Sequence, residues 1–532
     1  MTTNPLSPAP PQREAQVLIA GAGPTGLVLA LMLTRQGVRV RIVDPLAQPG
    51  TTSRALAIQA RTLEFYQQIG LANTVVERGR QFESANLWVA GRKVARIPFG
   101  AIGAGMSPFP HLTIFPQDQH ERLLIDQLSA LGIEVERGTS VASFADAGTR
   151  IRVQLARAGG AAESCDVMFL AGCDGAHSKV REGIGATFEG GTYAHTFYVA
   201  DVDAIGVASD GQLHVALEAT DFAAVFPMKG AGHLRIVGAV RPDTSAKESP
   251  PTWADVGHKV VSDIGLTVSQ VHWFSTYRVH HRVANHFTKG QAFLLGDAAH
   301  VHSPVGGQGM NTGIGDAVNL AWKLAAFIHG QADARILATY EPERIAFARQ
   351  LVHTTDRAFE FVTNKSAPVR WLRLRLIPIV LPILAAFTTV RRFIFRTVSQ
   401  IGIHYPSSWL SAGHAGRVHA GDRLPWVPLG DDANAAPGFP GPGNFAPLSS
   451  LAWQVHVYGD APAALAERCA ARGLALHAFP WLNAMHTAGL ARGASYLIRP
   501  DGYVALADPA ASPDTLERFL NDRNLLRPPS AA

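Results

Sequence analysis

Three glycines near the start of the chain have the spacing that binds a pyrophosphate. Gly21, Gly23 and Gly26 follow the apolar run 16–20 and precede an Ala- and Leu-rich stretch to about Gln36. The first glycine permits a tight turn, the second lets the backbone approach phosphate, and the third lets helix and strand pack closely. A second strand ends at Asp44, whose carboxylate can accept from ribose hydroxyls. The pattern predicts a dinucleotide site, without separating NAD from FAD.

Two further motifs place a carboxylate directly after an apolar strand. Asp297 follows the run 292–296, and the Gly-rich turn 304–309 opens a helix at about Gly313. A carboxylate there can bind the ribityl hydroxyls of a flavin. The first amides of the helix can stabilise the flavin pyrimidine, which becomes anionic on reduction. Asp174 with Gly175 forms a similar acid-glycine turn after 167–171. Taken singly, each motif is also typical of an ordinary surface turn.

In this order and at these separations, the motifs resemble the class A flavoprotein aromatic hydroxylases of the para-hydroxybenzoate and phenol hydroxylase type. The resemblance spans about residues 15–400, and its most specific stretch is GDAAHVHSPVGGQGMN at 296–311. It implies an α/β fold, in which a Rossmann-type FAD-binding domain is interleaved with a mostly antiparallel β substrate domain. With the three glycines, it assigns cofactor contacts to Asp44, Arg54, Gln117, Asp174, Asp297, Gly309, Met310 and Asn311.

The activity implied by the resemblance is monooxygenation of a phenolic or other aromatic small molecule. FAD would be the cofactor, NADPH or NADH the co-substrate, and O2 the oxygen donor through a flavin C4a-hydroperoxide. Asp174 would serve both FAD and NAD(P)H. Two alternatives stay open on the same scaffold: Baeyer–Villiger oxygen insertion into a polycyclic or ketone substrate, and a flavin reductase without oxygen transfer.

The residue that would polarise a substrate hydroxyl is not specified by the sequence. A phenol with a pKa near 10 costs about 4 kcal/mol to ionise at neutral pH, so a base or hydrogen-bond partner is expected. The candidates are His214, Tyr193, His302 and Pro304, the last through its carbonyl. For His214, Tyr193 and His302, a purely structural role is the more ordinary explanation, whereas Pro304 is expected to shape the face of the flavin ring.

Residue patterns along the chain predict several domains. Strand–helix–strand patterns assign 15–184 and 286–365 to one discontinuous FAD-binding domain, after a disordered leader at 1–14. Helices are expected over 53–70, 120–131, 313–328 and 340–362. Strand-like runs at 185–285 predict the substrate sheet, and 366–414 a helical segment. By resemblance, 415–532 is a thioredoxin-like domain, and the absence of a Cys-x-x-Cys pair excludes redox work by it.

Composition limits the partners of the protein. A formal charge of +5 over 532 residues, without a long basic run, does not indicate nucleic-acid binding. Three scattered cysteines provide neither a disulfide framework nor a zinc site, so no metal is expected, and the protein is predicted to be cytoplasmic. The 15 uncharged residues 376–390 are too few to span a bilayer. A buried helix or a homodimer contact is expected there, with peripheral membrane contact through 370–396 as the alternative.

Overall fold

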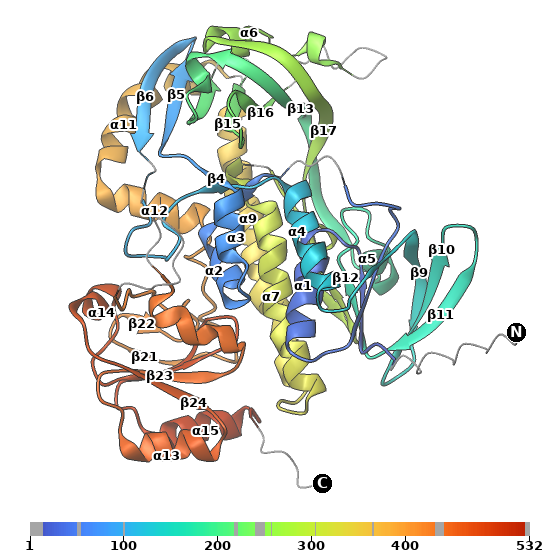
Figure 1. Ribbon diagram of the computed structural model, residues 1–532, viewed down its shortest axis with the longest axis vertical. Helices are drawn as coiled ribbons and strands as arrows, with labels where there is room; N and C mark the ends of the chain where they lie inside the picture. Colours follow the sequence, from blue (N-terminus) through green and yellow to red (C-terminus); the bar gives the residue numbers. More distant parts are fainter. Residues whose placement is uncertain are drawn as a thin grey trace, which may run out of the picture.

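The computed structural model describes most of the chain, in ten segments. They are residues 14–50, 55–98, 100, 102–217, 222–239, 251–256, 258–303, 305–363, 366–430 and 441–526. Figure 1 shows a parallel sheet with helices at the centre of the molecule, a long arched sheet above it and a C-terminal unit below. Within these segments, no helix combines the length and apolar character needed to cross a membrane.

The central sheet has six strands in the order β18-β19-β12-β1-β2-β8. All neighbours are parallel except β18 and β19, which are antiparallel. All four residues of β1 are buried, which is why it is a continuous apolar run rather than an alternating one. The strands are β1 (Val17–Ala20), β2 (Val40–Asp44), β8 (Val135–Arg137), β12 (Phe169–Gly172), β18 (Thr288–Lys289) and β19 (Ala292–Leu294).

Helices α1, α4 and α7 cover this sheet and share one apolar core with it. The helices of this part are α1 (Pro24–Arg35), α2 (Ala60–Gln68), α3 (Ala72–Arg78), α4 (Gln117–Ser129), α5 (Lys179–Ile184), α7 (Gly309–Ile328), α8 (Arg335–Ala338) and α9 (Tyr340–Thr363). The helix expected at 53–70 begins later than predicted. Ala57–Ile58 forms the short strand β3, because it pairs with β7 (Thr113–Ile114), which also pairs with β4 (Arg80–Gln81).

A three-stranded antiparallel sheet lies beside the central sheet. It contains β9 (Thr139–Asp146), β10 (Ile151–Arg157) and β11 (Ala162–Val167). Short 3-10 turns connect other elements: η1 (Val207–Ser209), η3 (Trp253–Asp255), η4 (Gly296–Ala298), η5 (Val305–Gly307) and η7 (Gly443–Ser450).

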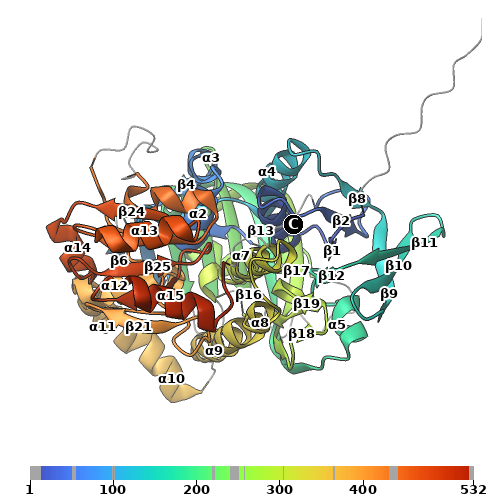
Figure 2. The same cartoon turned by 90° about the horizontal axis from the view of Figure 1, so that it is seen from below.

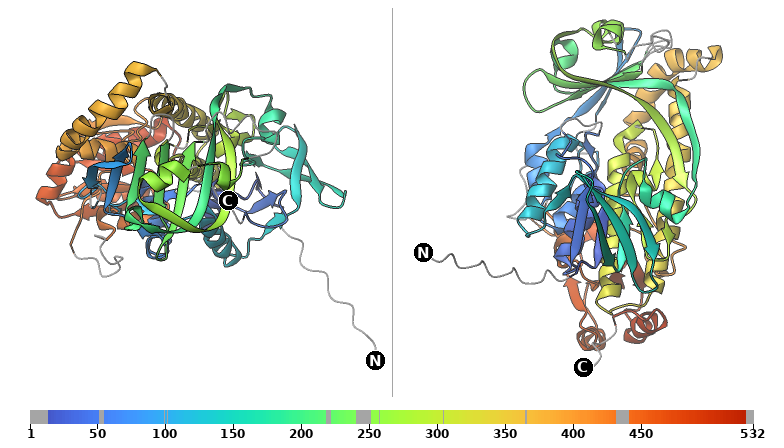
Figure 3. Two further views of the ribbon diagram at one scale, coloured as in Figure 1. Left: turned by 90° about the horizontal axis from the view of Figure 1, so that it is seen from above. Right: turned by 90° about the vertical axis from the view of Figure 1, so that its right-hand side faces the viewer.

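The arched sheet has eight strands in the order β20-β17-β13-β16-β15-β14-β5-β6. Figure 3 shows its long strands curving over the central sheet. It extends beyond the predicted span 185–285, since β5 and β6 join its edge and β14 pairs with β5 in parallel. The strands are β5 (Ser84–Val89), β6 (Arg92–Pro98), β13 (Phe188–Gly206), β14 (Leu213–Leu217), β15 (Phe222–Pro227), β16 (His233–Ala239), β17 (Leu266–Ala284) and β20 (His300–Val301).

The two faces of the arched sheet have different neighbours. On the inner face, Phe226 packs with Leu56 and with Ile114 of β7. On the outer face, Tyr198 packs against Trp253, beside the helix α6 (His258–Asp263). Because side chains alternate along a strand, the inner face of β13 carries residues 197, 199, 201 and 203.

The remaining helices and the C-terminal unit complete the molecule. A π-turn, Leu372–Leu376, separates α10 (Ala367–Trp371) from α11 (Ile377–Ala386), and α12 (Thr388–Val398) follows. The C-terminal sheet has the order β22-β21-β26-β25-β23-β24. Its elements are β21 (Ala412–Ala415), β22 (Val418–His419), β23 (Gln454–Tyr458), α13 (Ala463–Ala471), β24 (Ala475–Phe479), α14 (Asn483–Ala488), β25 (Ser495–Ile498), β26 (Val504–Asp508) and α15 (Pro513–Asp522).

Candidate functional site

The three motifs meet at one edge of the central sheet. Parallel strands end together, so the turn after β1, the end of β2 and the turns after β12 and β19 lie at the same edge. These positions carry Gly21, Asp44, Asp174 and Asp297. The carboxyl edge of a parallel sheet is where ligands bind in folds of this class.

The glycines of the first motif have two different roles: two permit close packing, and one leaves space for a ligand. A side chain at Gly21 would lie 2.3 Å from the carbonyl oxygen of Cys173, and one at Gly26 would lie 2.0 Å from the carbonyl oxygen of Gly21. At these two positions, neighbouring backbone atoms therefore leave no room for a side chain. A side chain at Gly23 would meet no protein atom within 4 Å. Gly23 leaves open space beside the backbone, as a bound pyrophosphate requires.

Thr25 joins the first motif to the last. Side chains at Gly296 and Gly313 would lie 2.7 Å and 2.3 Å from its Oγ1. This close packing brings the beginnings of α1 and α7 together. The residues that precede these helices, Gly23 and Gln308, provide no side-chain cap. The first-turn amides of both helices are therefore suited to anionic groups of a dinucleotide. The cradle formed here (21–26, 44, 297, 302–303 and 305–311) fits FAD.

Asp44 is held in place at the end of β2. Its carboxylate accepts from the backbone N–H of Ala22 at 2.8 Å and of Leu46 at 2.9 Å, and it lies 3.3 Å from the Arg137 guanidinium. Only 8% of the residue is exposed. A carboxylate has further lone pairs beyond these contacts, so it can still accept from a ribose hydroxyl.

His302 provides a buried acceptor beside the start of α7. Its Nδ1–H donates to the carbonyl oxygen of Ser303 at 2.8 Å, which leaves Nε2 as the acceptor. Nε2 is buried without a protein partner among the described residues and would lie 3.7 Å from a side chain at Gly309. Burial, followed by the charge of His300, lowers the pKa of His302 to about 4, so the ring is neutral at pH 7.

The loop that carries Asp297 is held in place by the buried carboxylate of Asp316. The sequence did not single out Asp316 as a site residue. Asp316 accepts from the Gly296 N–H at 3.0 Å, from His300 Nε2 at 2.7 Å and from Arg344 Nε at 2.5 Å. Burial alone would raise its pKa, but Arg344 and His300 together lower it. A signal was present, because an acid among the apolar residues Ile314, Ala317 and Val318 of α7 requires a partner.

Several predicted cofactor residues are engaged with the protein itself. The Asn311 amide donates to the carbonyls of Ala57 and Gly307 and accepts from Gln59 N–H, so its side chain anchors β3 to α7. Gln117 donates to Glu121 at 2.8 Å, and Asp174 accepts from the backbone at the start of α5. Gly309 and Met310 form the first turn of α7. Asp297 is exposed at the sheet edge, whereas Arg54 lies outside the described residues.

Two of the candidate residues for substrate contact, His214 and Tyr193, lie on opposite faces of the arched sheet. His214 lies on the outer face of the arched sheet, with Nδ1 accepting from Trp88 at 2.9 Å and Nε2 2.7 Å from Asp210. Both ring nitrogens are satisfied, and the ring faces away from the cradle. Tyr193 instead packs with the inner-face cluster of Phe197, and its hydroxyl donates to Asp356 of α9. Pro304 lies outside the described residues.

Comparisons with known proteins agree with this geometry. Residues 14–355 match the family model described as "FAD binding domain". The chain is 33% identical to 6-methylpretetramide 4-monooxygenase of Streptomyces rimosus, over 97% of this chain and 95% of that protein. The protein belongs to this family of FAD-dependent monooxygenases. Pentachlorophenol 4-monooxygenase of Sphingobium chlorophenolicum is 32% identical over 68% of each chain. The anhydrotetracycline hydroxylase OxyS from Streptomyces rimosus superposes with a TM-score of 0.76, at 27% identity over 97% of this chain and 100% of that one.

The protein is therefore a flavoprotein monooxygenase of the aromatic hydroxylase type. Its cofactor is FAD, and NAD(P)H is the reductant typical of the family. The resemblance inferred from the three motifs is confirmed by the family match and by the full-length relative.

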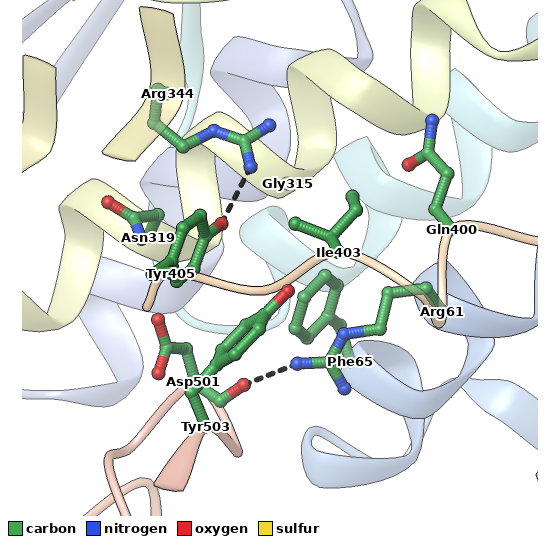
Figure 4. Close-up of a pocket in the computed structure, with 10 residues that line it drawn as sticks. All are labelled: Arg61, Phe65, Gly315, Asn319, Arg344, Gln400, Ile403, Tyr405, Asp501 and Tyr503. Atoms are coloured by element: carbon green, nitrogen blue, oxygen red, sulfur yellow. Dashed lines mark hydrogen bonds between the residues drawn. The ribbon is translucent and has the colours of Figure 1, made fainter. Parts of the chain in front are cut away.

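Away from the cradle, this monooxygenase has a buried ionic junction between its FAD-binding part and its C-terminal unit, which lie side by side in Figure 2. Glu343 of α9 accepts from Lys323 at 2.8 Å and from Arg499 at 2.9 and 3.0 Å, and Arg499 also contacts Asp501 at 2.6 Å. All four residues are buried. Next to them is a cavity with room for about one water molecule. Figure 4 shows the residues that line it, among them Arg61, Arg344, Tyr405 and Tyr503. The cavity is too small for a substrate.

Proposed function

We propose that this monooxygenase uses NAD(P)H and O2 to hydroxylate a neutral phenolic or polycyclic aromatic molecule. The substrate would bind between the cradle and the inner face of the arched sheet. The observation that carries the proposal is the likeness over almost the whole chain to 6-methylpretetramide 4-monooxygenase. The aromatic cluster of the inner face supports it, with Phe197 lying 5.8 Å from Phe222 and 5.9 Å from Tyr277 between ring centroids.

The charges on the inner face favour a neutral substrate over an aromatic carboxylate. Arg235 of β16 points from this face and is bound by both oxygens of Asp201, each at 2.6 Å. The guanidinium is 5.8 Å from the Trp273 ring centroid and is only 2% exposed. A cation already neutralised in this way offers little to an anionic substrate.

When bound, FAD supplies the activation of O2 that side chains do not provide. The chain's own groups would position the substrate and exclude water. Tyr193 and Asp356 would hold a substrate hydroxyl at the inner face. His302 would accept a hydrogen bond at the cradle through its neutral Nε2.

The test is NADPH and NADH oxidation by the FAD-loaded enzyme over a panel of phenols and polycyclic hydroxyarenes under labelled O2. A product with one labelled ring hydroxyl supports the proposal. A labelled lactone would assign Baeyer–Villiger insertion, and reductant consumption without label would assign a reductase. Tyr193→Phe should lower kcat about a hundredfold, the low end of a general acid–base contribution. His214→Gln, a matched change on the outer face, should leave kcat unchanged.

We further propose that 415–532 contributes a thioredoxin-like domain used for structure rather than redox chemistry. The strand order β24-β23-β25-β26, with β23 parallel to β24 and antiparallel to β25, supports this assignment. The order of elements along the chain, β23-α13-β24-α14-β25-β26-α15, also supports it. Cys469 is buried, and burial raises its pKa to about 11. We also propose that residues 15–184 and 286–365 form the FAD-binding domain, 185–285 the substrate domain and 366–414 a helical segment. Strands β5 and β6 join the sheet of the substrate domain.

A third proposal concerns an exposed surface on α10–α12, which we infer to contact an anionic membrane surface. Trp371, Ile379, Ile383, Phe387 and Phe393 are each 57–69% exposed there, and Figure 1 shows α11 projecting from the side of the molecule. Residues 361–421 contain seven arginines and no acid. A symmetric contact between two copies would bring these arginines together without a carboxylate, whereas anionic lipids complement them.

Flotation with vesicles tests whether this surface binds anionic lipids. The enzyme should bind phosphatidylglycerol-containing vesicles and not pure phosphatidylcholine, and 0.5 M NaCl or Phe387→Ser with Phe393→Ser should release it. Absence of vesicle binding, together with a dimer that the double variant dissociates, would assign the surface to a second copy instead.

A further inference from the structure

One histidine–carboxylate cluster lies outside the cradle, at the far end of the inner face. Asp203 of β13 lies between His233 of β16 and His272 of β17, the strands on either side of it. His233 Nδ1 is 2.7 Å from Asp203 Oδ1, and His272 Nε2 is 2.8 Å from Oδ2. All three potential ligand atoms lie within 4.8 Å of one another.

Irregularities in β17 bring His272 to this position. Asp201 pairs with Trp273 and Val202 with Val271, so His272 is the extra residue of a β-bulge. A second shift between Asp203 and Ala204 follows directly. Bulges redirect side chains and often lie next to functional sites. His233 needs no such device, because it is directly opposite Asp203 in an antiparallel pair.

The surroundings allow a cation to enter and remain. The side chains of His233, Asp203 and His272 are 35%, 40% and 36% exposed, so water and ions reach them. Arg235, two residues from His233 on β16, is neutralised by Asp201. The hydrogen bonds from both imidazoles lower the pKa of Asp203, which therefore stays ionised.

We propose that the His233–Asp203–His272 triad is a binding site for a divalent transition-metal ion of the zinc class. Two imidazoles and one carboxylate are the ligand types that Zn2+ prefers, at about 2.0–2.2 Å. Ligand atoms around such an ion are roughly 3.4 Å apart, so the triad must open by about 0.6 Å from its hydrogen-bonded state.

The ion would tie β13, β16 and β17 together at the end of the sheet that covers the proposed substrate site. Three protein ligands leave at least one coordination position for water. The site is independent of the flavin chemistry, since its residues belong to a different part of the chain from the cradle. It also differs from a magnesium site, because hard cations prefer oxygen ligands.

Calorimetric titration of Zn2+ into chelator-treated, FAD-loaded enzyme tests the proposal. One Zn2+ per chain should bind at micromolar or lower concentration, and Mg2+ should not. Hydrogen exchange at 266–275 and 233–236 should slow with Zn2+. His272→Gln and Asp203→Asn should each weaken binding at least tenfold, while retaining FAD and the melting temperature measured without metal.

His414→Gln is the matched control, because it removes a different histidine pair. His414 and His419 stack at 5.7 Å in the C-terminal unit, and this variant should bind Zn2+ like the parent. Two results would overturn the proposal. The triad would be a hydrogen-bonded cluster only if no Zn2+ bound, and the ion would lie elsewhere if H272Q and D203N bound it unchanged.

Discussion

The two ends of α7 contact polar regions of opposite character. At its beginning, in the cradle, helix amides lack side-chain caps and His302 Nε2 is buried without a described protein partner. Further along, Asn319 and Lys323 of the same helix enter the junction, where Glu343 binds both of them and Arg499. The cradle leaves polar groups for a ligand, whereas the junction satisfies its charges internally.

This difference separates a binding site from a structural one. The junction contains four buried charged residues, and shifted pKa values alone would suggest catalysis there. Burial, and then the charge of Arg499, lower the pKa of Lys323 to about 8, although the Glu343 carboxylate opposes this shift. Yet every one of these charges faces an opposite one within the protein. A shifted pKa at a charge that already has an opposite partner inside the protein is therefore weak evidence of catalysis in this molecule.

The largest expected effect comes from breaking the junction. Glu343→Gln would leave Lys323 and Arg499 buried without their shared carboxylate. Removing one partner of a buried pair costs about 3–5 kcal/mol, and the denaturation midpoint should fall accordingly. Asp166→Asn, which breaks the exposed pair with Arg152, should not change it measurably. Equal effects of the two variants would contradict the internal pairing.

Two alanine substitutions in the same loop should separate an effect on stability from an effect on FAD binding. Gly26→Ala places a methyl group against the Gly21 carbonyl and should cost about 1–3 kcal/mol of stability, or prevent folding. Gly23→Ala meets no protein atom, so the apoprotein should melt like the parent. Its FAD affinity, measured by fluorescence, should fall at least tenfold, about 1.4 kcal/mol. Unchanged FAD affinity would place the pyrophosphate elsewhere.

Acidification should weaken the apoprotein through His302. Its folded pKa of about 4 is below the unfolded value of about 6.5, so only the unfolded chain gains a proton between these pH values. Stability is therefore lost as pH falls through this window, by at most about 2 kcal/mol from this residue at pH 5. Denaturation at pH 7 and pH 5 should show a smaller difference for His302→Asn. An identical pH dependence would mean that the ring is protonated in the folded protein.

The smallest effect is expected on the outer face. His214→Ala removes the acceptor of the buried Trp88 N–H and should cost about 1 kcal/mol, the low end for an unsatisfied donor. Turnover at saturating substrate should stay within twofold of the parent. A loss of kcat without loss of stability would return His214 to the catalytic candidates.

The cofactor, the reaction class and the central sheet could be predicted from the sequence. Gly21, Gly23, Gly26 and Asp44 act within a short stretch, and local patterns of this kind follow from strand, turn and helix geometry. The motif at 296–311 is equally local. The helix at 53–70 was placed too early, because the strand at 57–58 exists only through pairing with 113–114.

Only the tertiary structure decided which polar residues face each other across the molecule. The faces of Tyr193 and His214, the anchoring of Asp297 through Asp316, and the Glu343–Arg499 junction depend on contacts between distant segments. No local sequence pattern predicts the triad of Asp203, His233 and His272, and none argues against it. Its members become neighbours through strand order and one bulge. The sequence by itself determined which residues could bind FAD, because that information lies in short local motifs. The tertiary structure decided which of the other charged residues pair with each other, because those partners are far apart in the sequence.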